Sequence, residues 1–281
     1  MDKTNFHTHS LYCDGKAPLE AFVRTALNHH FSVLGFSSHA PVPFSNGFAV
    51  AEDQLPVYCR EVRALQEKYA EQIQIFLGLE ADYIPGVTRS FSALRASCGL
   101  DYIIGSVHLV VNPDKKGLWF IDGPRVSTYD NGLKMLFDND IRAAVGAYYT
   151  QIQQMIRAGA FEIIGHLDKI VMHNNHRFFS TDAPWYTTLM TETLEQIRQQ
   201  NLIVEVNPRG RYKGRCSNLF PEEKWLPVIR EMKIPVMLNS DAHHPDDLMK
   251  EYDYSLAAIR AAGFSYLHIY DGANFIEQEI R

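Results

Sequence analysis

Two histidines near the start of the chain have the spacing of a metal site. The segment Asn5-Phe6-His7-Thr8-His9 has the pattern of a short strand, and residues two apart in a strand point to the same side. Both imidazoles would therefore face one point, where a single ion can bind them. Such a pair also occurs by chance at the polar ends of strands, so the pair alone does not decide between the two interpretations.

Metal-binding side chains also follow most of the other short apolar runs. Any single histidine is more often an ordinary core or surface residue, but unrelated histidines have no reason to fall at successive strand ends. A site for several ions, in contrast, needs imidazole and carboxylate ligands at such positions. These residues are His39 after VLGFSS, Glu80 within FLGLEAD, His108 at the end of IIGSVH, His166 at the end of EIIGH, and Asp241 and His243 after PVMLNS.

The elements that must position these residues alternate between short strands and longer helices, which is typical of a mostly parallel α/β architecture. In a βα barrel the C-terminal strand ends share one rim, so ligands distant in sequence would meet there. The expected strands are residues 4–8, 33–38, 73–81, 102–110, 161–167, 202–207 and 235–240. The expected helices include residues 18–31, 52–69, 140–157, 184–201 and 246–262. Residues 112–139 and 171–183 interrupt the alternation and are predicted to be long loops over the site.

Composition limits the class of protein. The 281 residues are 46% hydrophobic with a net charge of −6, which predicts one domain over residues 1–281 and disfavours nucleic acid as a partner. Four cysteines without a CxxC pair indicate reduced thiols. With no signal peptide and no long apolar run in the sequence, we expect a cytoplasmic protein without membrane contact. The oligomeric state is left open.

The ligand types suit zinc, iron or manganese, since imidazole and carboxylate bind all three. The set is too large for one tetrahedral ion, so two or three ions are expected, with Glu80 as a candidate bridge. Clustered ions of this kind activate water, so the nucleophile expected from such a centre is a metal-bound hydroxide.

Taken together, these residues, with Asp14, resemble the signature of the polymerase-and-histidinol-phosphatase (PHP) family over nearly the whole chain. The resemblance implies a distorted seven-stranded (β/α)7 barrel and three metals. It assigns His7, His9, Glu80 and Asp241 to the first metal, Glu80, His108 and His166 to the second, and Asp14, His39 and His243 to the third. Some relatives have His where this chain has Asp14.

Four sequence segments look most like those of the histidinol-phosphate phosphatases of that family: GSVHLV, WFIDG, IGHLDKI and EVNPRGRYKGR. This implies hydrolysis of a small phosphomonoester, L-histidinol phosphate, in histidine biosynthesis. Many such enzymes have Asn-Thr-x-Gly-x-Arg after the sixth strand. In this chain the arginines and the lysine after that strand stand at positions that differ from this pattern. The candidates for phosphate binding are Arg209, Arg211, Lys213 and Lys169, with Arg209 first, and Arg215 lies in the same basic run. A solvated basic patch is the alternative.

Several other residues have open or minor roles. Asp168 could orient an imidazole or cap the next turn. Cys13 is expected to be a passive neighbour of His9 rather than a nucleophile. His29 and His30 are expected within a helix and His268 in a strand near the end, all three structural.

Three functions remain at this point. The first is a phosphomonoesterase acting on histidinol phosphate. The second is another PHP-type phosphoesterase, acting on a different phosphomonoester, a nucleotide or a nucleic acid with the same metals. The third is a metal-storing or regulatory protein that has kept the fold without catalysis, which the full ligand set disfavours.

Overall fold

The computed structural model describes residues 2–280, and seven parallel strands form its centre. Their order is β1-β2-β3-β4-β7-β8-β9, and each neighbouring pair is parallel. The strands are β1 (Lys3–Asn5), β2 (Phe31–Phe36), β3 (Gln74–Asp82), β4 (Tyr102–Ser106), β7 (Ile163–Ile164), β8 (Ile203–Val206) and β9 (Val236–Leu238).

The sheet curves until its two edges meet. Thr8 and Ala242 form a parallel bridge beyond the ends of β1 and β9, and the His9 N–H donates to the Ala242 carbonyl at 2.8 Å. The expected seven-stranded α/β barrel is therefore confirmed, and it is nearly closed.

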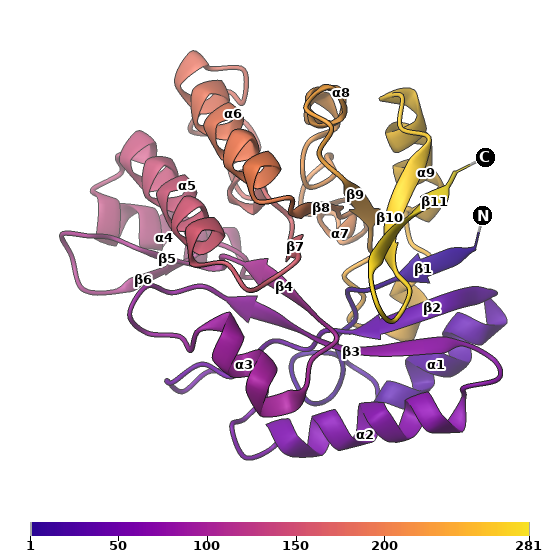
Figure 1. The fold of residues 1–281 in the computed structure, drawn as a ribbon. Helices are drawn as coiled ribbons and strands as arrows, with labels where there is room; N and C mark the ends of the chain where they lie inside the picture. Colours follow the sequence, from indigo (N-terminus) through magenta and orange to yellow (C-terminus); the bar gives the residue numbers. More distant parts are fainter. Residues whose placement is uncertain (1, 281) are drawn as a thin grey trace.

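Helices cover the outside of the strands, as Figure 1 shows. They pack through apolar stripes; in α5, for example, Val145, Tyr149 and Ile152 are all buried. The helices are α1 (Leu19–Asn28), α2 (Leu55–Lys68), α3 (Phe91–Cys98), α4 (Val126–Phe137), α5 (Ile141–Ala158), α6 (Pro184–Gln199), α7 (Arg209–Tyr212), α8 (Leu226–Glu231) and α9 (Tyr252–Ala261). Short 3-10 turns occupy Lys169–Val171, Glu223–Trp225 and Pro245–Asp247. No helix within residues 2–280 is long and apolar enough to cross a lipid bilayer.

Two antiparallel hairpins are added to this barrel. The first pairs β5 (Leu109–Val111) with β6 (Leu118–Phe120), and the second pairs β10 (Tyr266–Tyr270) with β11 (Phe275–Glu279). The second hairpin brings the C-terminus to the same side of the molecule as the N-terminus (Figure 1).

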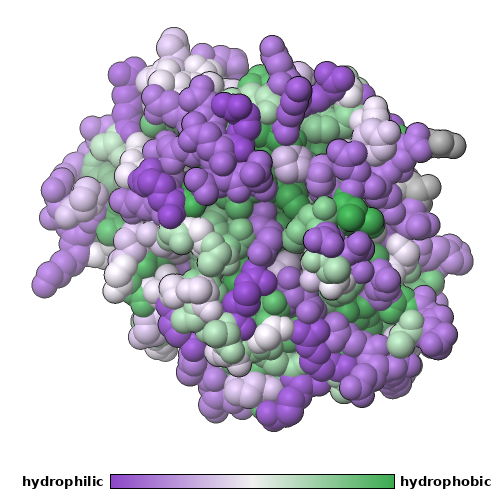
Figure 2. All heavy atoms as spheres, viewed as in Figure 1, coloured by the Kyte–Doolittle hydropathy of each residue, from purple (hydrophilic) through white to green (hydrophobic). Residues whose placement is uncertain are grey.

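Apolar side chains fill the barrel at the N-terminal ends of the strands. Phe6, Phe76, Tyr102 and neighbouring aliphatic residues form a separate cluster there, which Tyr270 and Phe275 of the hairpin β10–β11 cover. The Tyr102 ring lies so close to Gly78 that an added Cβ would be 2.4 Å from it, so only glycine fits. On the face drawn in Figure 2, hydrophobic residues gather toward the middle and hydrophilic ones dominate the periphery.

The prediction of a loop over residues 112–139 was wrong, because the segment holds β6 and α4. The segment was expected to be a loop because it is rich in Gly, Asp and aromatic residues, yet Gly132 serves packing: an added Cβ would lie 2.1 Å from the indole of Trp119. The helix expected over residues 246–262 begins only at Tyr252, after a 3-10 turn. The strand expected over residues 102–110 is divided into β4 and β5.

Candidate metal centre and active site

All nine residues expected as metal ligands lie together where the barrel strands end. Glu80 lies within β3, and the others sit in the segments that follow β1, β2, β4, β7 and β9. Because these strands are parallel, their C-terminal ends form one rim of the barrel. The loops that follow the strands therefore all start at this rim. The nine residues are His7, His9, Asp14, His39, Glu80, His108, His166, Asp241 and His243.

Glu80 is the carboxylate at the centre of this cluster. It is almost fully buried. Five imidazole rings lie close to its carboxylate, three near one oxygen and two near the other. Oε2 lies 3.1 Å from His7 Nε2, 3.4 Å from His9 Nε2 and 3.1 Å from His39 Nδ1. Oε1 lies 2.9 Å from His166 Nε2 and 3.4 Å from His108 Nε2. Glu80 thus lies between the first and second expected groups, and it also faces His39 of the third.

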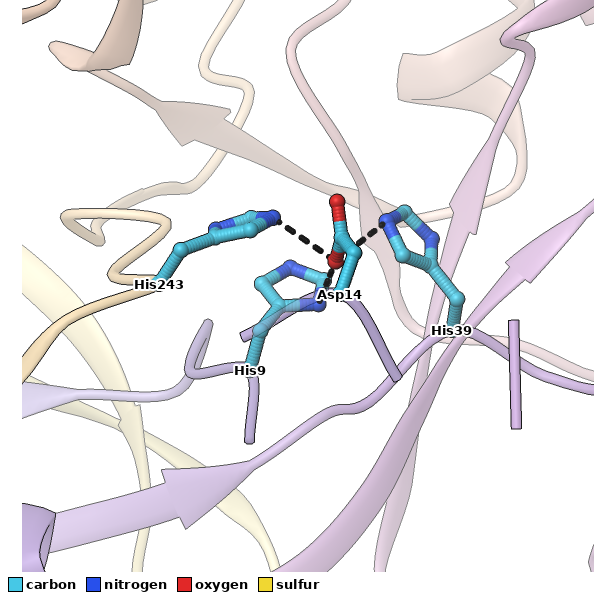
Figure 3. Close-up of side chains that lie close together, drawn as sticks. All are labelled: His9, Asp14, His39 and His243. Atoms are coloured by element: carbon cyan, nitrogen blue, oxygen red, sulfur yellow. Dashed lines mark ion pairs between the residues drawn. The ribbon is translucent and has the colours of Figure 1, made fainter. Parts of the chain in front are cut away.

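Asp14 is the centre of the third group, as Figure 3 shows. Its Oδ1 lies 3.1 Å from His243 Nε2, 3.8 Å from His39 Nε2 and 3.9 Å from His9 Nδ1. His243 and His39 approach the carboxylate from opposite sides (Figure 3). The Asp14 side chain is 31% exposed, whereas that of Glu80 is 1% exposed, so solvent reaches the cluster from this side.

Several atoms of the cluster are buried without a hydrogen-bond partner, which is a costly arrangement unless a cation binds them. Three sets of ligand atoms have spacings that suit one ion each: His9-Asp14-His39-His243, His7-His9-Asp241 and His39-Glu80-His108. The donor set therefore fits a centre of several metal ions. The unpartnered atoms are His7 Nε2, His9 Nε2, His39 Nδ1, Asp14 Oδ1 and Asp241 Oδ1.

Two further buried carboxylates orient the histidines from behind. Glu205 in β8 lies with Oε1 2.6 Å from His7 Nδ1, and its Oε2 accepts the N–H of His166. Asp82 at the end of β3 lies with Oδ1 3.1 Å from His108 Nδ1. Such partners fix the ring so that the other nitrogen faces the metal. Neither residue was identified from the sequence. A carboxylate in a buried strand is nevertheless a signal, because such a group needs a hydrogen-bonding or charged partner in the protein interior.

The electrostatics of the cluster keep its carboxylates ionised. Burial acts to raise the pKa of Glu80, but His7, His39 and His108 outweigh it and hold that pKa well below its usual value. Burial acts to lower the pKa of His7, yet Glu205, Glu80 and Asp241 raise it well above the ordinary value. His9, beside His243 and His39, has a lowered pKa through burial and these neighbouring rings. Negative charge is therefore concentrated where cations would bind.

Three cations lie close to the cluster. Arg209 is buried, and its guanidinium donates to the Asp241 carbonyl at 2.8 Å. Lys169 Nζ and Arg215 NH1 lie 3.2 Å and 3.3 Å from the same Asp122 oxygen. The other Asp122 oxygen lies 3.7 Å from Nε2 of His108. Asp122 of the WFIDG segment thereby holds two cations at the edge of the centre, a role the sequence did not reveal.

The other two candidates for phosphate binding have partners outside the nine-residue cluster. Arg211 Nε lies 3.2 Å from Glu251, and its guanidinium stacks over the ring of Tyr254. Lys213 Nζ lies 2.8 Å from Asp247. The short helix α7 separates these side chains from Arg209, since successive residues on a helix point in different directions.

Both roles considered for Asp168 were wrong. Its Oδ2 accepts the N–H of Glu222 at 2.8 Å, and it makes no cap to the 3-10 turn that follows. Burial, with the charge of Glu222, raises its pKa. His29 and His30 follow the last residue of α1, so their placement within the helix was also wrong. His268 lies in β10 as expected.

The thiol of Cys13 lies 3.5 Å from Nδ1 of His9. Burial, with the neighbouring Asp14, raises the pKa of this thiol. A protonated thiol is a poor nucleophile, which agrees with the expectation of a passive neighbour.

Comparison with known proteins decides the family. The PHP domain model matches residues 5–209, a span that includes seven of the nine clustered residues. The chain belongs to the PHP domain family. Within this family it is 28% identical over 263 residues to a probable histidinol-phosphatase of Deinococcus radiodurans, covering 92% of each chain. It is 27% identical over 271 residues to a histidinol-phosphatase of Bacillus subtilis, covering 90% of this chain and 98% of that one.

Two solved structures share the fold. A putative histidinol phosphatase from Listeria monocytogenes superposes with a TM-score of 0.80 at 22% identity, over 90% of this chain and 99% of that one. A histidinol phosphate phosphatase from Lactococcus lactis, complexed with zinc, L-histidinol and phosphate, gives a TM-score of 0.68 at 20% identity, over 98% and 99%.

Proposed function

We propose that this chain is a histidinol-phosphate phosphatase, which hydrolyses L-histidinol phosphate to L-histidinol and phosphate. The observation that carries the proposal is the similarity, over about nine tenths of the chain, to histidinol-phosphatases in a chain that gathers nine candidate metal ligands on one rim. The enzyme is a hydrolase of phosphomonoesters, and its place is in histidine biosynthesis in the cytoplasm.

The nine clustered residues are the proposed metal ligands, in the three groups that family resemblance assigns. Glu80 bridges the first and second groups through its two oxygens, which point to different imidazoles. Zinc, iron and manganese all suit these ligands, and zinc has the support of the Lactococcus lactis complex. Metal ions bound there supply an activated water and neutralise charge on the phosphoryl oxygens.

The residues of the chain then have separate tasks. Glu205 and Asp82 hold His7 and His108 in the orientation that ligation requires. Arg209 and Lys169, with Arg215, bind the phosphate at the edge of the centre, because guanidinium and ammonium groups pair with phosphoryl oxygens. The Lys169 ammonium is buried and makes no hydrogen bond, although Asp122 Oδ1 lies 3.2 Å away, so its N–H donors remain for phosphoryl oxygens. Arg211 and Lys213, paired with Glu251 and Asp247, are less suited to this task.

The proposal is tested by assaying the metal-loaded protein with L-histidinol phosphate beside other phosphomonoesters and beside single- and double-stranded nucleic acid. We expect the largest kcat/KM with L-histidinol phosphate and no nuclease activity, since a net charge of −6 opposes a polyanion. A preference for another phosphomonoester, a nucleotide or a nucleic acid would replace the proposal with a PHP-type phosphoesterase of that specificity. Metal binding without hydrolysis of any ester would favour a storage or regulatory protein.

A further inference from the structure

Phe48 lies beside the metal centre on the loop that follows β2. Its ring meets the ring of His39 edge to face, with centroids 5.5 Å apart. The loop is fixed at this point, because Val50 N–H donates to the His39 carbonyl and Asn46 Oδ1 accepts the N–H of both Phe48 and Ala49. The aromatic ring is therefore held beside a proposed ligand by the backbone itself.

Phe120 brings a second ring to the same place from the hairpin β5–β6. It pairs in register with Leu109, the residue after His108, and the next residue, Ile121, donates its N–H to the His108 carbonyl. The Phe120 and Phe48 rings stack at 15° with centroids 6.1 Å apart. The two rings form one aromatic wall, which runs from the His39 ring to the strand β6 paired with the segment after His108.

This wall has no evident task in folding. Neither ring belongs to the two hydrophobic clusters of residues 2–280, nor to the partly buried residues packed against them. Both rings stay partly exposed. Large apolar side chains left partly in water beside a polar centre are typical of ligand contact.

We infer that the Phe48–Phe120 wall contacts the imidazole ring of the substrate and sets the preference for an aromatic phosphomonoester. This inference rests on the proposed function. The phosphate would lie by the metal ions and the Asp122-held cations, and the short aliphatic chain of histidinol would place its imidazole against the adjoining wall. Contact between the substrate imidazole and the phenylalanine rings would favour binding, because it buries apolar surface and allows offset or edge-to-face stacking.

The test compares two substrates that share a phosphate and an ammonium group but differ in the ring: L-histidinol phosphate and ethanolamine phosphate. Phe48→Leu and Phe120→Leu should each raise KM for L-histidinol phosphate roughly 3- to 10-fold, the size of one aromatic contact. Rates with ethanolamine phosphate and the metal content should not change. Phe48→Tyr keeps a ring and should restore the wild-type KM.

Phe44→Leu is the matched control, since Phe44 lies on the same loop and no ring contact joins it to the centre among the described residues. Equal losses with both substrates, or a wild-type KM in the double leucine variant, would overturn the wall as a specificity element. These outcomes differ from failure of the proposed function, in which the wild-type protein itself shows no preference for L-histidinol phosphate.

Discussion

The two ends of the barrel differ in chemistry although the same seven strands run into both. At the N-terminal ends, apolar side chains fill the interior and the hairpin β10–β11 covers them. At the C-terminal ends, buried imidazole and carboxylate atoms face one another without hydrogen-bond partners. One end gains stability by excluding water, while the other carries unpaired polar atoms whose burial costs free energy until cations bind. Variants at the two ends should therefore separate activity from stability.

The largest effect on activity is expected from Glu80→Gln at the metal end. The amide removes a charge that faces five imidazoles and, by the proposed bridging, serves two ions at once. We expect a loss of kcat of roughly 100-fold or more in assays at saturating substrate.

Asp14→Asn should cost less, because Asp14 serves at most one ion and is partly exposed. Circular dichroism on both variants checks that the fold is kept. Equal residual rates in the two variants would remove the bridging role of Glu80.

A smaller loss is expected from Arg209→Ala. A charged hydrogen bond to phosphate is worth about 1.5–3 kcal/mol, so kcat/KM should fall by roughly 10- to 100-fold through KM, and through kcat as well if the guanidinium stabilises the transition state. The metal content should stay the same, since guanidinium does not ligate metals.

Arg211→Ala is the matched control two residues further along α7, where the side chain points elsewhere and pairs with Glu251. Its kcat/KM should stay within about twofold of wild type. If Arg209→Ala left kcat/KM unchanged, phosphate binding would pass to Lys169 and Arg215.

The smallest effect on activity is expected at the opposite end. Tyr270→Ala removes a ring that packs on Phe76 with centroids 5.0 Å apart and on Phe275. Because Tyr270 is only partly buried, urea denaturation should show a loss of about 1–2 kcal/mol in the free energy of unfolding. The kcat/KM should not change, and a drop in catalysis at full folding would contradict the separation of the two ends.

The sequence predicted the barrel and the clustering of the nine candidate ligands because both depend on strand ends, which apolar runs mark clearly. His108 and His166 could be placed from their neighbours in the chain alone. Glu205 and Asp82 could not, since their partners are 198 and 26 residues away and only the closed barrel brings them together. For the same reason the basic run could not be divided into Arg209, beside the centre, and Arg211, beside Glu251.

The predicted boundaries of helices and loops were wrong where tertiary contacts determine them. The segment 112–139, which includes α4, looks like a loop because it is rich in Gly, Asp and aromatic residues, but packing against Trp119 stabilises the helix. The predicted roles of Asp168 were wrong for a similar reason, because its buried carboxylate accepts a hydrogen bond from the backbone N–H of Glu222 on a distant segment. Neither contact leaves a local pattern.

The most direct test of the metal end is the metal content of the purified protein, measured by elemental analysis before and after chelation and reconstitution with zinc, iron or manganese. The account predicts two or three ions per chain, loss of phosphatase activity on chelation, and recovery of both on reconstitution. Finding no bound transition metal, even after reconstitution, would contradict the assignment of the nine clustered residues as ligands.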